Sequence, residues 1–213
     1  MGEIFQPLIQ WYFDHLNYGT VTLLMTIESS FIPFPSEVVI PPAVYHSVAS
    51  TEMNAILIVL FATLGAILGA LINYFLSLWI GKPLVYKFAD SKLGHMFLLS
   101  GEKINNAEKY FNDHGAISTF IGRLIPAIRQ LISIPAGLAK MPLGRFVAFT
   151  ALGAGIWNTV LALLGYYLGK AVPEDQLIST VEHYSHEIGY TIAAIVVVVI
   201  AVIIIRNYRK KKA

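Results

Sequence analysis

The stretch ESSFIPFPSEVVIPPA (residues 28–43) places two carboxylates, Glu28 and Glu37, in a segment that is otherwise apolar and contains four prolines. Proline lacks a backbone donor and breaks a helix. At membrane depth, broken backbone is tolerated only where it is buried in protein or lines a water-filled cavity. The stretch therefore predicts a broken helical hairpin, shaped by Pro33 and Pro35, that holds the two acids in a polar interior.

The composition around this stretch is typical of an integral membrane protein. Of the 213 residues, 56% are apolar without counting glycine and only 13% are charged, whereas about 25% of a soluble domain is charged. The chain has no cysteine, which excludes disulfides, thiolate metal sites and cysteine nucleophiles. We expect a single membrane domain.

Three uncharged segments are long enough to cross the hydrocarbon core, which takes about 20 helical residues. They are residues 53–81, 146–169 and 188–205. Two further apolar segments, residues 16–45 and 116–140, are interrupted by prolines and charges. The sequence predicts that these two form broken hairpins instead of simple spans.

The distribution of Lys and Arg predicts which side each loop occupies, because basic residues favour the cytoplasm. Residues 82–113 contain five lysines, and we expect this segment in the cytoplasm. Residues 47–52 contain no Lys or Arg, and we expect them outside. Residues 53–81 then cross the membrane inward.

The second hairpin is predicted to enter and leave on the cytoplasmic side. Lys140 and Arg145 follow it, and the chain ends in a basic tail over residues 206–213. If residues 116–140 crossed the membrane once, all of these basic groups would lie outside, against the usual bias. A basic tail after an apolar helix is more simply a cytoplasmic anchor than a nucleic-acid-binding patch, so we expect no nucleic acid as a partner.

An internal repeat supports the two-hairpin arrangement. LGAILGALINYFLSLWIGK (residues 64–82) aligns without gaps to LGAGIWNTVLALLGYYLGK (residues 152–170). Upstream, FIPFPSEVVIP (residues 31–41) resembles LIPAIRQLISIP (residues 124–135). If the first hairpin enters from outside and the second from inside, the two units form an inverted-topology repeat, the architecture that places a transport site at the membrane midplane.

The predicted fold is therefore an all-α polytopic membrane protein with two inverted repeats. Each repeat is a re-entrant helical hairpin followed by a glycine-containing transmembrane helix, and Pro126 and Pro135 shape the second hairpin. In chain order the predicted segments are an amphipathic surface helix (1–15), a first hairpin (16–45), a transmembrane helix (53–81), a cytoplasmic segment (82–113), a second hairpin (116–140), a transmembrane helix (146–169), a last transmembrane helix (188–205) and the basic tail (206–213).

Four charged residues lie within the hairpins, namely Glu28, Glu37, Arg123 and Arg129. Each would cost roughly 2.5–3.5 kcal/mol at the centre of a simple transmembrane helix, so pairing between the hairpins is the cheapest explanation. Arginine also offers a planar fork of donors that fits phosphate oxygens, and a buried carboxyl group can exchange a proton. We expect a site for a phosphate-bearing amphiphile linked to protonation. Purely structural salt bridges, or an interfacial position for Glu37 and Arg123, are the alternatives.

The stretch FIGRLIPAIRQLISIPAGLAKMPLGRFVAFTALGAGIWN (residues 120–158) resembles the signature of the DedA family, also called the VTT-domain proteins. The match includes two arginines six apart, the following Pro-Ala-Gly, the Met-Pro and a glycine before Trp157. The resemblance implies two facing re-entrant hairpins and movement of lipids between leaflets. It implies, for bacterial members, proton-dependent return of undecaprenyl phosphate or phosphatidylethanolamine across the inner membrane, and for eukaryotic relatives phospholipid scrambling.

The paired acids of the family match Glu28 and Glu37, and its paired arginines match Arg123 and Arg129. Many members have Gly-Asp at the second acid after a longer gap, whereas this chain has Ser36 followed by Glu37. The resemblance implies a multi-pass protein of the bacterial inner membrane with a cytoplasmic C-terminus. A membrane lipid and protons are the expected partners, and a homo-oligomer is left open.

Other functions are weighed against lipid transport. An intramembrane phosphatase would need a nucleophile or a histidine base near the arginines; Ser133 has no evident base. The histidines all fall in predicted loops or surface segments: His15, His46, His95, His114, His183 and His186. We therefore expect no enzyme activity, no cofactor and no metal. A small-ion or proton-coupled exchanger and a non-transporting scaffold remain as alternatives.

Overall fold

A computed structural model describes residues 11–30, 35–50, 53–91, 101–125, 128–168 and 170–171, and the single positions 180, 184 and 191. All regular elements within these residues are helical, which confirms the predicted all-α class. The elements are α2 (Tyr18–Glu28), the 3-10 helix η1 (Ser36–Val38), α3 (Ile40–Ser50), α4 (Ala55–Ala89), α6 (Gly101–Leu124), α7 (Ser133–Leu138) and α8 (Leu143–Leu168).

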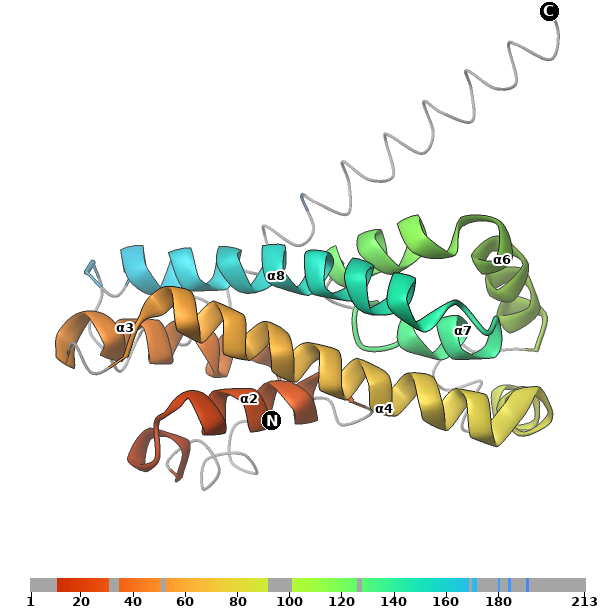
Figure 1. The fold of residues 1–213 in the computed structure, drawn as a ribbon, viewed down its shortest axis with the longest axis horizontal. Helices are drawn as coiled ribbons and strands as arrows, with labels where there is room; N and C mark the ends of the chain where they lie inside the picture. The colour runs from red at the N-terminus through yellow and green to blue at the C-terminus, as the bar shows by residue number, and fades with distance from the viewer. Residues whose placement is uncertain are drawn as a thin grey trace, which may run out of the picture.

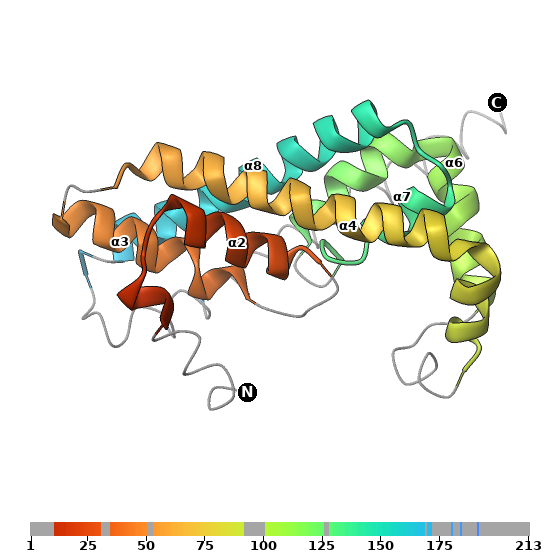
Figure 2. The same cartoon turned by 60° about the horizontal axis from the view of Figure 1, so that its bottom comes forward.

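Two long helices, α4 and α8, lie side by side and run in opposite directions (Figure 1). Their segments Ala55–Gly81 and Leu143–Leu168 are long and apolar enough to cross a membrane. Gly81 has a φ of 71°, and Figure 2 shows the last part of α4 turning away from the helix axis. Only glycine adopts this backbone conformation readily. Apart from the single position 191, the predicted span over 188–205 and the basic tail lie outside the described residues.

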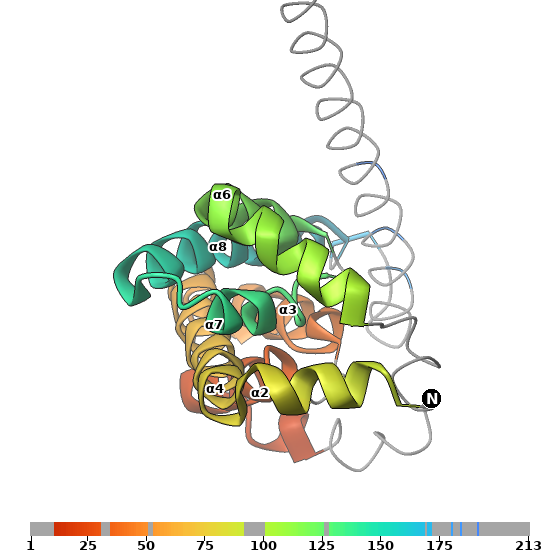
Figure 3. The same cartoon turned by 90° about the vertical axis from the view of Figure 1, so that its right-hand side faces the viewer.

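The shorter helices pack against opposite halves of this long pair. In Figure 1, α2 and α3 lie toward one end and α6 and α7 toward the other. Each long helix contacts a short helix from both halves: α4 contacts α2 and α7, and α8 contacts α6 and α3. Seen from the end, α3 and α7 lie between the pair α6 and α8 and the pair α2 and α4 (Figure 3). The pair α2 and α3 and the pair α6 and α7 therefore approach each other near the middle of the molecule.

Glycines allow the closest of these helix contacts. A Cβ atom added at Gly65 would overlap the carbonyl oxygen of Thr22 in α2. A Cβ atom at Gly153 would lie 2.6 Å from the Cβ of Arg123 in α6. Small residues at such crossings let helix backbones approach closely. In a membrane this close packing drives helix association, because the hydrophobic effect does not. The contacts fix α2 on α4 and α6 on α8.

The chain before α2 also packs into this core. Trp11–Asp14 form a helical turn, and the buried Tyr12 donates a hydrogen bond to the carbonyl oxygen of Val39 at 2.7 Å. Asn17 then caps α2 by accepting from the backbone of Thr20 at 3.1 Å, a capping interaction that stabilises a helix start. Most of the surface helix predicted over residues 1–15 lies outside the described residues.

Candidate functional site

The two predicted breaks are both interruptions between helices. In the first, α2 ends at Glu28, and η1 (Ser36–Val38) precedes α3. In the second, α6 ends at Leu124 and a run of turns over residues 128–132 leads into α7. The backbone at each break is not part of a continuous helix, so side chains there can leave the helix surfaces and point toward each other.

The described prolines stand where a helix starts. Pro35 is the N-cap residue of η1 and has extended backbone, with ψ at 127°. Pro135 is the third residue of α7, within the first turn, where its missing N–H would have no intrahelical acceptor. These positions agree with prolines that shape the breaks. Pro33 and Pro126, predicted to do the same, lie outside the described residues.

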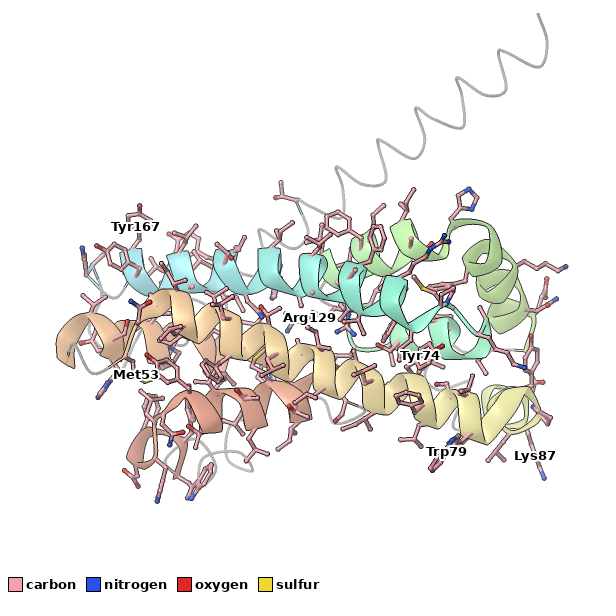
Figure 4. All side chains as sticks on the ribbon, in the orientation of Figure 1. Met53, Tyr74, Trp79, Lys87, Arg129 and Tyr167 are labelled. Atoms are coloured by element: carbon pink, nitrogen blue, oxygen red, sulfur yellow. The ribbon has the colours of Figure 1, made fainter. Side chains whose placement is uncertain are left out.

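Arg129 brings the predicted acids together. Its Nη2 atom lies 2.8 Å from Oε1 of Glu28 and 3.7 Å from Oε2 of Glu37. The same nitrogen donates a hydrogen bond to Oγ of Ser36 at 2.8 Å. Figure 4 places Arg129 between α4 and α8, near the middle of the long axis. The buried guanidinium group of Arg129 thus connects the second break to the first.

Two serines support the carboxylates from within the first break. Ser29 donates to Oε2 of Glu28 at 2.7 Å, whereas Oε1 is ion-paired with Arg129 at 2.8 Å but accepts no hydrogen bond from the residues that the structure describes. Ser36 donates to Oε2 of Glu37 at 3.3 Å. The sequence carried a signal for these contacts, because each acid has a serine as its direct neighbour, but the pattern was not recognised as a support for buried charge.

Arg123 is held in a different way. Its Nη2 atom donates to Oγ of Ser133 in α7 at 2.8 Å. Among the described residues, no carboxylate is recorded within ion-pair distance of it. Arg123 is 2% exposed and Glu37 5% exposed, so neither lies at the protein surface. The four predicted residues are therefore all buried, and Arg129 has both acids as neighbours.

Two further residues that sequence reasoning missed belong to this cluster. The guanidinium carbon of Arg129 lies 5.3 Å from the ring centroid of Trp157, a cation–π contact. Nδ2 of Asn73 donates to the carbonyl oxygens of Ser29 at 3.3 Å and Gln130 at 3.2 Å. One amide of α4 therefore ties both breaks together. In the sequence, Asn73 could have been noticed as a polar amide inside an uncharged segment of membrane-spanning length.

The cluster combines buried hydrogen-bond donors with buried carboxylates. It offers arginine and indole donors, and its carboxylates are already held by arginine and serine. In the described part of the chain, no three His, Cys, Asp or Glu side chains gather in a way that could hold a metal ion. No histidine is among the partners recorded there for the four charged residues.

Comparison with known proteins gives matches over most of the chain. Residues 34–167 match the model of the VTT domain. An "Alkaline phosphatase-like protein" of Lactococcus lactis is 35% identical over 97% of this chain and 95% of its own length. "Undecaprenyl phosphate transporter A" of Staphylococcus aureus is 28% identical over 97% of this chain and 100% of its own. "Uncharacterized membrane protein YkoX" of Bacillus subtilis is 32% identical over 94% of this chain and 83% of its own length. No solved structure matches.

Proposed function

Because this chain belongs to the VTT-domain (DedA) family, we propose that it moves a phosphate-bearing lipid between the leaflets of the bacterial cytoplasmic membrane. The observation that carries the proposal is the buried cluster in which Arg129 contacts Glu28 and Ser36, near the middle of two membrane-length helices. Buried ionisable groups inside a membrane domain are costly and generally mark a substrate or ion pathway.

A phosphate headgroup fits this cluster better than a neutral one. Arginine binds phosphate through two parallel, charge-assisted hydrogen bonds. Within the described part of the chain, the hydroxyl of Ser133 is the one hydrogen-bond acceptor recorded for Arg123, so its guanidinium retains donors for an anion. Since a relative that aligns over its whole length is named an undecaprenyl phosphate transporter, a polyprenyl phosphate is the first substrate that we propose, and a phospholipid such as phosphatidylethanolamine is the second.

We expect charge balance to couple entry of the lipid headgroup to uptake of a proton. The two acids and two arginines of the cluster are formally neutral together. A phosphate adds at least one negative charge, and it competes with Glu28 for Arg129, which lies 2.8 Å from that acid. A buried carboxylate that loses its counter-ion favours the protonated form. We therefore propose that Glu28 takes up a proton when the headgroup binds and releases it when the headgroup leaves.

The packing of the helices supports re-entrant hairpins that face each other. Gly65 and Gly153 are equivalent in the internal alignment, and each contacts the first helix of its own hairpin, α2 or α6. The second helices cross over, since α3 contacts α8 and α7 contacts α4. A pseudo-two-fold repeat would produce this pattern. We propose that the first hairpin enters the membrane from outside and the second from the cytoplasm.

Cysteine labelling tests this topology, because the chain contains no cysteine of its own. Val48, near the outer end of α3, and Lys109, in α6, are both exposed. In intact cells, an impermeant thiol reagent should label the variant Val48→Cys. The variant Lys109→Cys should react only after the membrane is permeabilised. The opposite pattern would overturn the proposed orientation.

Transport itself is tested with purified protein in sealed vesicles. A fluorescent polyprenyl phosphate should cross between leaflets faster than in protein-free vesicles, and faster than the matching polyprenol without phosphate. Labelled phosphatidylethanolamine provides the comparison with a phospholipid. Release of inorganic phosphate would point to a phosphatase, and proton or ion flux without lipid movement would point to an exchanger. Equal movement of the phosphate and the polyprenol would contradict a phosphate-recognising site.

A further inference from the structure

Three buried N–H groups near the breaks have no acceptor among the described residues. They are Nε1 of Trp157, Nε of Arg123 and Nε of Arg129. Buried donors in proteins are almost always paired, and a buried tryptophan normally finds a partner for its N–H. The ion pair and serine contacts described above use the Nη2 atoms of the arginines. These three donors therefore form a separate set that the fold alone does not satisfy.

The three donors belong to residues that meet on one face of α8. The guanidinium of Arg129 lies over the ring of Trp157 at 5.3 Å. Arg123 contacts α8 at Gly153, which precedes Trp157 by four residues and so lies on the same helix face. Thr150, with a hydroxyl that is also buried and unpaired, lies one turn further along this face. The residues that carry the unsatisfied groups therefore lie on or against one face of α8.

We infer that Trp157 is a headgroup-binding residue whose indole N–H donates to the same phosphate that the two arginines hold. Indole can only donate, and so can guanidinium, so their common ligand must supply several acceptor oxygens. A phosphate monoester at the end of a lipid does this. This inference rests on the proposed function and narrows its substrate class.

The three N–H groups also bear on the choice between lipids. Phosphatidylethanolamine carries an ammonium group next to its phosphate, and that group would need an acceptor in the site. Oε2 of Glu28 accepts from Ser29 at 2.7 Å, and Oε1, which accepts no hydrogen bond within the described part of the chain, lies 2.8 Å from Nη2 of Arg129, so an ammonium group would have to compete with Arg129 for it. A headgroup made only of acceptor oxygens leaves no such group unpaired.

The substitution Trp157→Phe tests the indole N–H, because it keeps an aromatic ring under Arg129 and removes only the donor. A hydrogen bond to a charged acceptor corresponds to about tenfold to a hundredfold in binding. We expect the apparent KM for polyprenyl phosphate in the vesicle assay to rise by that factor. The matched control is Trp79→Phe, since Trp79 is 87% exposed on α4 and Trp157 is 1% exposed. An unchanged KM in Trp157→Phe would overturn the inference while leaving the proposed transport intact.

Fluorescence gives a second measurement that does not depend on transport. The chain has three tryptophans, so the double variant Trp11→Phe and Trp79→Phe leaves Trp157 as the sole indole. Titration of this variant with a short-chain polyprenyl phosphate in detergent should change the emission saturably, and the matching polyprenol should not. No change, in protein whose wild-type form transports the lipid, would contradict the inference. A saturable change without wild-type transport would support the site and refute the proposed function.

Discussion

Arg123 and Arg129 are six residues apart and both buried, yet the fold uses them differently. Arg129 reaches out of the second break to the first, where it contacts Glu28 at 2.8 Å and Ser36 at 2.8 Å. Arg123 stays within its own half and donates to Ser133. The difference shows that position relative to the break, and not residue type, decides the role. Arg129 is ion-paired with Glu28, whereas Arg123 contacts a serine hydroxyl.

The largest effect should follow from Arg129→Ala. This substitution leaves Glu28 buried without its cation, and breaking a buried pair typically costs about 3–5 kcal/mol. We expect a loss of that size in the free energy of unfolding, measured by denaturation in detergent. Adding Glu28→Gln should recover part of it, because the stranded charge is then removed. If Arg123→Ala destabilised the protein as much, the contrast between the two arginines would be wrong.

Lysine substitutions separate charge from geometry. A lysine keeps the positive charge but lacks the planar fork that holds phosphate at two points. We expect both Arg123→Lys and Arg129→Lys to fold and to lose about tenfold to a hundredfold in transport of polyprenyl phosphate. Only Arg129→Lys should also shift the pH dependence of transport, because only Arg129 is paired with Glu28. Wild-type transport by Arg129→Lys would make that residue a structural counter-ion alone.

These contrasts also show how much of the site could be predicted from the sequence. The high cost of charge in a membrane, with two acids and two bases in the hairpins, was enough to predict pairing between the breaks. It could not predict that Arg129 contacts both acids, because that depends on the path of the broken backbone. The amide of Asn73 contacts carbonyls 44 and 57 residues away. No local pattern encodes such distances, nor the stacking of Arg129 on Trp157.

A smaller effect is expected from the packing behind Arg123. In Gly153→Ala the new methyl group would meet the Cβ of Arg123 at 2.6 Å, so α6 must shift. Overpacking of this kind costs typically about 1–3 kcal/mol. The matched control is Gly155→Ala, since its nearest neighbour is Thr63 at 3.8 Å. We expect lower stability and slower transport for Gly153→Ala only. Equal behaviour of the two variants would mean that the position of Arg123 is not set by this contact.

The smallest effect should come from Glu37, the second acid. Its nearest oxygen lies 3.7 Å from Nη2 of Arg129, too far for a hydrogen bond, and a glutamine could still accept from Ser36. We expect Glu37→Gln to change the free energy of unfolding by about 1 kcal/mol or less. Glu28→Gln should fold as well, because the amide oxygen can face Arg129 while the amide NH2 donates to the hydroxyl of Ser29.

Transport measured across pH distinguishes the two acids. Under the proposed coupling, Glu28 takes up a proton when phosphate displaces it from Arg129, so acid conditions should favour headgroup binding and alkaline conditions should oppose it. Glu28→Gln removes the titrating group and should make binding insensitive to this proton. Glu37→Gln should keep the wild-type dependence, since the pair at 2.8 Å is intact. A flat pH profile in Glu37→Gln, with a normal one in Glu28→Gln, would transfer the proton-linked role to Glu37 and reverse the assignment of the two acids.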